Sequence, residues 1–157
     1  VAYQALWGKR LSTPDVAFAA IRKAAAAGDW GRVYDELSRA ARAEPAKQLV
    51  DRKAELEKTP EGERAAVAKS MGLDPERWRQ ATPREYFAAT VAKLAGVEGR
   101  GAPEFLRQLL DLPRAEFLRY VVAGDLARVF FRTPGGPADG ESISFVLEGG
   151  EWHPDPQ

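Results

Sequence analysis

The chain contains no cysteine among its 157 residues, and this absence removes several classes of chemistry at once. A chain without thiols has no disulfide framework, no thiolate-held metal and no cysteine nucleophile. Histidine is nearly absent too, since His153 is the only one. No cluster of histidine, aspartate and glutamate shows metal-ligand spacing. The sequence therefore predicts neither a metal site nor a bound cofactor.

Net charge and long apolar runs are also missing. Lysine plus arginine and aspartate plus glutamate each number 23, so no long-range field draws the chain toward nucleic acid. No stretch approaches the ~20 apolar residues that a membrane-spanning helix needs. We therefore expect no nucleic-acid partner and no transmembrane segment in this chain.

The chain begins at Val1 rather than at methionine, and no signal-peptide pattern precedes that residue. Such a start fits an exported protein that has lost its leader, and it fits a trimmed chain equally. The compartment stays open on this basis. The favoured expectation is an extracytoplasmic location, periplasmic or membrane-anchored after processing.

What the chain does contain is a helical first two thirds. Residues 13–15 (Thr-Pro-Asp) combine an N-cap residue, a first-turn proline and an acidic first turn, which indicates a helix start. Gly28 is placed to end this helix, and Asp29 to cap a second one over residues 30–41. Residues 82–85 (Thr-Pro-Arg-Glu) have the spacing of a capping box and predict another helix start.

The domain organisation follows from charge and from the chain start. Residues 45–71 carry dense charge and only a thin apolar face, so they are predicted to form a charged helical insertion. Residues 1–11, which include Trp7, are predicted to form an N-terminal arm that docks on the body or on a neighbour. Residues 12–157 have the length of one domain.

The last third changes character and reads as β-structure. Three short runs rich in β-branched and aromatic residues cover 116–122, 126–133 and 141–147, and residues 151–153 close the pattern. Turn residues bound each run. Helices first and a meander of strands last is the order of an α+β domain, in which N-terminal helices pack on a C-terminal antiparallel sheet.

The predicted strands carry apolar residues on more than one face. In the second strand Phe130 and Phe131 point to opposite sides, so either both faces are buried or the outer one is an interface. We expect association through the sheet face, with a second copy or another protein. The candidate interface residues are Trp7, Phe130, Phe131 and Phe145.

Several segments together resemble the NTF2-like (SnoaL-like) superfamily, and most closely its exported bacterial versions of unknown function. These segments are residues 13–18, the Ala-Gly-Asp-Trp break at 27–30, strand residues 127–131 and the hairpin 144–152. The most specific part is the terminal pattern Phe-Val-x-Glu-Gly-Gly-x-Trp.

The resemblance implies a cone, in which a curved antiparallel sheet wraps around helices and leaves a cavity at the wide end. The family includes dehydratases, isomerases, ligand carriers and non-catalytic protein partners, so the fold does not name the function. This chain departs from the pattern in two respects. It shows only three strands and a stub, with an insertion at 45–71, and it lacks the acid and histidine pair of the catalytic members. No catalytic residue is therefore carried over.

The histidine and the aromatic residues are the remaining candidates for a site. His153 lies near the chain end beside Pro154, where we expect solvent exposure rather than acid–base catalysis. Aromatic side chains are candidates to line a cavity and to orient a polar group of a ligand, against the alternative of ordinary core packing. The candidate cavity residues are Tyr34, Trp78, Tyr86, Tyr120 and Trp152.

The sequence thus favours a non-catalytic binding or assembly module that takes a small apolar ligand or a protein partner. One alternative is an enzyme of the dehydratase or isomerase kind, using a tyrosine and a carboxylate in the cone cavity. Another is an accessory subunit of a larger exported or membrane-associated complex, docked through residues 1–11.

Overall fold

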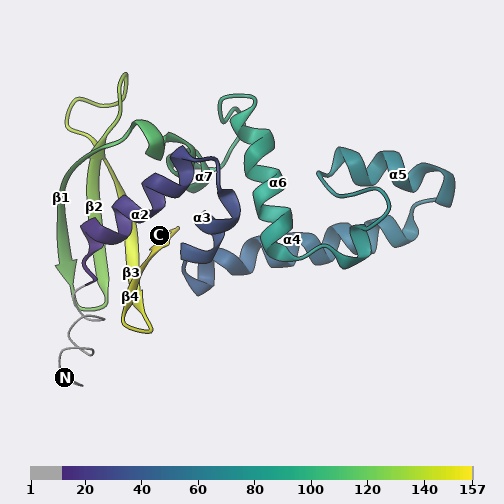
Figure 1. The fold of residues 1–157 in the computed structure, drawn as a ribbon, viewed down its shortest axis with the longest axis horizontal. Coiled ribbons are helices and arrows are strands. Elements are labelled where there is room, and N and C mark those ends of the chain that lie inside the picture. Colours follow the sequence, from purple (N-terminus) through teal and green to yellow (C-terminus); the bar gives the residue numbers. More distant parts are fainter. Residues whose placement is uncertain (1–11, 157) are drawn as a thin grey trace.

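The computed structural model describes residues 12–156 and orders them as helices followed by a sheet (Figure 1). In this part of the chain the α-helices are α2 (Pro14–Ala26), α3 (Trp30–Glu36), α4 (Arg39–Lys58), α5 (Glu61–Ser70), α6 (Pro83–Ala95) and α7 (Glu104–Asp111), with short 3-10 turns at Trp78–Gln80 and Leu112–Arg114. The strands are β1 (Glu116–Ala123), β2 (Leu126–Arg132), β3 (Glu141–Glu148) and β4 (Glu151–Asp155). The predicted α+β class is confirmed.

The sheet is a meander in which each strand pairs antiparallel with the next, in the order β1-β2-β3-β4. Gly124, with φ at +64°, supplies the left-handed backbone that the tight turn between β1 and β2 requires. Residues 151–153, predicted only as a closing stub, belong to the complete strand β4. The meander follows from short strands separated by turn residues, as predicted.

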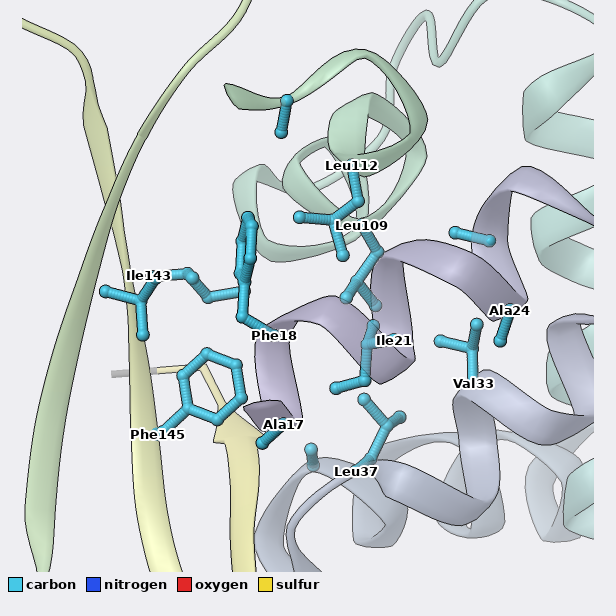
Figure 2. Close-up of a cluster of buried hydrophobic side chains, with 14 of the residues drawn as sticks. Ala17, Phe18, Ile21, Ala24, Val33, Leu37, Leu109, Leu112, Ile143 and Phe145 are labelled. Atoms are coloured by element: carbon cyan, nitrogen blue, oxygen red, sulfur yellow. The ribbon is translucent and has the colours of Figure 1, made fainter. Parts of the chain in front are cut away.

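Helix α2 covers one face of this sheet and forms the main core with it. Phe18 of α2 packs against Phe117 and Phe131, with ring centroids 6.0 and 5.7 Å away. Figure 2 shows the Phe18 side chain directed from α2 toward Ile143 and Phe145 of β3. Because side chains alternate along a strand, Phe131 and Phe145 point to this helix side. Both are fully buried, so neither offers surface to a partner as the interface hypothesis required.

The boundary between α3 and α4 differs from the prediction. The second predicted helix ran through to Ala41, but α3 ends at Glu36 and a new helix begins at Arg39. Ser38 is the reason, because its hydroxyl oxygen accepts a hydrogen bond from the backbone N–H of Ala41 at 3.0 Å and so caps α4. The predicted starts at Pro14, Trp30 and Pro83 are confirmed.

Residues 45–71, which the sequence predicts to be a charged helical insertion, lie in a helical arm with a small core of its own. Figure 1 shows α5 and the distal half of α4 extending away from the sheet. The arm core consists of buried residues from α4, α5, α6 and the segment between α5 and α6, namely Leu49, Leu56, Ala68, Leu73, Trp78 and Tyr86. This second cluster explains how α4 stays folded despite its thin apolar face, because its few apolar side chains in the arm, Leu49 and Leu56, are buried there.

The outer edge of β4 is closed by the junction of α3 and α4. The backbone N–H of Ser38 donates to the carbonyl of Pro154 at 2.9 Å, and the N–H of Arg39 donates to the Glu148 carboxylate at 2.9 Å. The carbonyl of Pro154 therefore points away from β3, and its nitrogen, which has no hydrogen to donate, points the same way. A proline is tolerated in this strand for that reason.

Candidate functional site

An apolar groove lies where α4, α6, α7 and Pro156 meet, with a volume of about 190 Å³. Phe87 and Val91 of α6 and Leu37 form its buried floor. Glu44 and Gln48 of α4 stand exposed at the rim. The wall opposite α4 is completed by half-buried side chains of α7, namely Phe105 and Leu106.

Local signals in the sequence position the helices that form this groove. Helix α6 begins at the predicted capping box, where the Thr82 hydroxyl accepts from the N–H of Glu85 at 3.2 Å and donates to its carboxylate at 2.9 Å. Helix α7 has apolar residues at 105, 106, 109 and 110, which is a wider face than one contact needs. One part of that face enters the core, and the other part lines the groove.

Arg84 fixes α6 against α3. Its guanidinium forms a two-pronged ion pair with Asp35, with N–O distances of 2.9 and 3.1 Å, and this hydrogen-bonded carboxylate raises the pKa of Arg84. The same guanidinium lies over Gly31, where an added Cβ would be 2.8 Å from the Arg84 side chain. The glycine thus allows the close approach of the two helices that sets the groove floor.

A polar depression of about 340 Å³ adjoins the groove and shares Phe105 and Pro156 with it. Its lining comes from α7, β2, β3 and β4 and includes Gln108, Arg128, Glu141, Ser142, Ser144 and Asp155. An apolar groove beside a polar depression can accommodate a ligand that has both kinds of surface.

The charged groups of the depression differ in how they are paired. Glu141 accepts from Arg107 at 2.9 Å, and this hydrogen bond, together with the charges of Glu141 and Asp111, raises the pKa of Arg107. Asp155 accepts from the Ser38 hydroxyl at 2.6 Å. Arg128 donates to the Ser142 hydroxyl at 2.9 Å, and within residues 12–156 it forms no ion pair with a carboxylate.

The five predicted cavity aromatics do not converge on one cavity. Tyr86 lines the groove and, with Trp78, also belongs to the arm core. Tyr34 is half-buried and packs on Phe87 with ring centroids 5.5 Å apart. Trp152 is buried in the main core, and Tyr120 is exposed on β1. The structure thus brings Trp78 and Tyr86 together and places the other three elsewhere.

Tyr86 also contacts the arm helix α4. A side-chain hydrogen bond with Tyr86 raises the pKa of the Arg52 guanidinium. Tyr86 therefore forms a wall between the groove on one side and the arm on the other, which makes it the sequence-predicted residue best placed at a ligand site.

His153 has a structural role that differs from the expected solvent exposure. It is half-buried in β4, and its Nδ1 lies 2.8 Å from the backbone carbonyl of Glu36. A carbonyl oxygen only accepts, so Nδ1 carries the hydrogen and donates. The side chain thereby ties the end of α3 to the sheet edge.

The remaining predicted residues and sites can be placed as follows. Phe130 lies on the outer face of the sheet, where the Arg119 guanidinium sits 4.0 Å from its ring centroid. Trp7 lies outside the described residues. Among residues 12–156, no group of acidic, histidine or cysteine side chains is arranged to hold a metal ion. No helix of the same part is both long and apolar enough to cross a membrane.

The groove was not predicted from the sequence, because its walls come from helices far apart in the chain. The one available signal was the wide apolar face of α7. Comparisons with protein-family models, with curated proteins and with solved structures found no match to the chain. The NTF2-like resemblance accordingly stays a prediction.

Proposed function

We propose that this chain is a non-catalytic binding module that holds the apolar part of a small ligand in the groove between α4, α6 and α7. The observation that carries the proposal is the lining of that groove, which is mostly apolar, with Glu44 and Gln48 at the rim, while the groove remains open at the surface. Ligand sites of proteins are concave and mostly apolar, with a few polar groups that set orientation.

The volume of the groove indicates the size of ligand that it would bind. Its volume of about 190 Å³ is close to that of an apolar cavity of about 150 Å³ that binds benzene in another protein. One aromatic ring or a short alkyl chain would fill it. A polar end of the same ligand would lie over the adjoining depression, beside Arg128 and Ser142.

The groups that line the groove favour binding over proton transfer. The carboxylate in the described lining is that of Glu44, which is exposed at the rim and accepts from Gln48 at 3.2 Å. A general acid or base acts best when it is partly desolvated and oriented toward the reacting group. An exposed glutamate held by its neighbour on the same helix meets neither condition.

We also propose that the fold is NTF2-like and that the module is exported. Support for the fold comes from the order of elements, helices and then an antiparallel meander that ends in the β3–β4 hairpin. The groove lies between helices rather than inside the curve of the sheet, so ligand binding here does not depend on that fold assignment.

The binding proposal is tested by NMR titration of the full chain with toluene and with hexanoate as probes. We expect saturable shifts confined to the methyl groups of Val91 and Leu106 and to neighbouring groove residues, with dissociation constants at or below about 1 mM. Hexanoate should also shift the side-chain signals of Arg128. Probe binding spread over the surface, or no saturation at several times that concentration, would overturn the proposal.

A further inference from the structure

The outer edge of β1 is open in the part of the chain that the structure describes. β1 is the terminal strand of the sheet and pairs only with β2 among residues 12–156. Figure 1 shows no helix on its outer side. Its exposed fractions are high for apolar side chains, at 39% for Leu118, 38% for Tyr120, 50% for Val121 and 45% for Val122. An open edge with apolar side chains is a template for pairing with another strand.

The two edge strands of the sheet, β4 and β1, differ in the residues that protect them from pairing with another strand. The β4 edge contains Pro154 and is covered by Ser38 and Arg39, as described above. β1 contains no proline and no lysine, either of which would discourage pairing with another strand. The charged residue in the middle of β1, Arg119, places its guanidinium over the ring of Phe130 and not at the strand edge. A register irregularity at Leu118 is the one feature that disturbs pairing, and it lies near the start of the strand.

The hairpin register identifies the backbone groups that are free to pair. Ala123 and Leu126 flank the two-residue turn, so they form the hydrogen-bonded pair that closes it. Hydrogen-bonded and non-hydrogen-bonded pairs alternate along an antiparallel ladder. Val121 therefore bonds to β2, whereas Tyr120 and Val122 direct their N–H and C=O groups toward the open edge.

Apolar side chains on the helix side of this edge are exposed and would be covered by an added strand. Tyr120 and Val122 pair with Val129 and Ala127, which face α2, so their side chains lie on the helix side of the sheet. Strand addition combines main-chain hydrogen bonds with contacts between alternate side chains. This edge offers the outward N–H and C=O groups of Tyr120 and Val122 and their exposed apolar side chains.

We propose that β1 pairs antiparallel with β1 of a second copy, about a two-fold axis at Tyr120, so that the two sheets join into one. In a two-fold contact, residue i of one copy faces residue j of the other and residue j faces residue i. The register must therefore suit both strands in the same way. Residues with outward N–H and C=O groups have to face one another across the new pair of strands. This condition allows registers whose two-fold axis passes through Arg119, Tyr120 or Val121.

The charge and the apolar side chains select among these registers. A centre at Arg119 would place two arginines directly opposite, which is unfavourable. A centre at Val121 would pair Leu118 with Gly124 of the second copy and leave its side chain without a partner. A centre at Tyr120 pairs Leu118 with Val122 in both directions and Tyr120 with itself. That register gives each of Leu118, Tyr120 and Val122 an apolar partner on the second copy.

The test uses charge at the proposed axis, measured by sedimentation velocity on the full chain. Wild type should sediment as a dimer at about 100 µM, and Tyr120→Glu or Tyr120→Lys alone should raise the dissociation constant at least about tenfold, because like charges then face each other. An equimolar mixture of the two variants should restore the dimer. Leu126→Glu, on the exposed part of β2 next to the turn, is the matched control and should leave the dimer intact.

A backbone variant tests the same edge independently. Val122→Pro removes an N–H that points away from β2, so it should weaken the dimer as strongly while circular dichroism shows the sheet retained. A monomeric wild type at the same concentration would overturn the proposal, as would a dimer indifferent to the Tyr120 variants. Restoration by Tyr120→Glu with Val122→Lys, and not with Tyr120→Lys, would overturn the Tyr120 axis.

Discussion

The hydroxyl of Ser38 donates to the carboxylate of Asp155 at 2.6 Å while it accepts from the backbone N–H of Ala41 at 3.0 Å. Ser38 and Asp155 are both buried. One hydroxyl group thus caps α4 and binds the end of the last strand. The junction that closes the sheet edge and the helix that forms one wall of the groove depend on the same side chain.

Ser38→Ala is expected to lower the free energy of unfolding by about 1–3 kcal/mol, because it removes a cap and leaves a buried carboxylate without its donor. Urea denaturation followed by circular dichroism measures the change. Ser70→Ala is the matched control, since the Ser70 hydroxyl is exposed and its one hydrogen bond within residues 12–156 goes to the carbonyl of Val67. Equal effects of the two substitutions would contradict the role given to Ser38.

The arm core should be separable from the main core by mutation. Leu56 is fully buried in the arm, so Leu56→Ala should cost about 2–5 kcal/mol of local stability. Hydrogen exchange should then rise in α5 and the distal part of α4, while protection in β2 and β3 stays unchanged. Val50→Ala, on the same helix but 67% exposed, should change stability by no more than about 0.5 kcal/mol. Loss of protection in the whole sheet would show that the arm and the body unfold as one unit.

The sequence predicts helix boundaries well here because the residues that cap and end the helices are of types with strong positional preferences. Gly28, Asp29 and the capping box at 82–85 each mark a boundary that the structure confirms. The end of α3 was missed because residues 30–41 read as one helical pattern. What divides the pattern is Ser38, whose hydroxyl caps α4 at Ala41 and also bonds to Asp155, far along the chain.

The site was less predictable than the fold, again for a physical reason. Aromatic residues mark burial, but their pattern does not say which of two cores receives each side chain. Trp152 is buried in the main core and Trp78 in the arm core. Tyr120 is exposed although its partner Val129 on β2 is fully buried, because β1 is the edge strand of the sheet. Contacts between residues far apart in the chain decide where each aromatic side chain lies, and the spacing of residues along the sequence does not reveal those contacts.

Arg107 pairs with Asp111 of its own helix α7 at an N–O distance of 3.0 Å, and it links α7 to β3 by a second ion pair with Glu141 at 2.9 Å. The folded state raises the pKa of Arg107, so the linkage stabilises the fold below the ordinary arginine pKa and is lost only above it. Stability should therefore not fall between neutral and moderately alkaline pH through this group. Because the arginine side chain is 40% exposed, solvent screens the pair, and Arg107→Gln should cost no more than about 1 kcal/mol.

Salt provides the check on that interaction. The difference in unfolding free energy between wild type and Arg107→Gln should shrink as sodium chloride is raised toward about 1 M, where the Debye length falls to about 3 Å. Thermal unfolding at several salt concentrations measures it. A difference that does not change with salt would indicate that the aliphatic stem of Arg107, and not its charge, contributes the stability.

Blocking the groove separates ligand binding from folding. Ala40 lies exposed at the groove, so Ala40→Trp should cover the opening with an indole ring without entering the core. The affinity for toluene should then fall at least about tenfold, because the ring replaces the ligand against the same apolar surface. Ala43→Trp adds the same ring to the exposed surface of the same helix, outside the groove lining, and should leave the affinity unchanged. If both variants bind toluene like wild type while remaining folded, the ligand site lies elsewhere. If both lose binding, the effect comes from α4 itself and not from occlusion. Only a loss confined to Ala40→Trp assigns the bound ligand to the space between α4, α6 and α7.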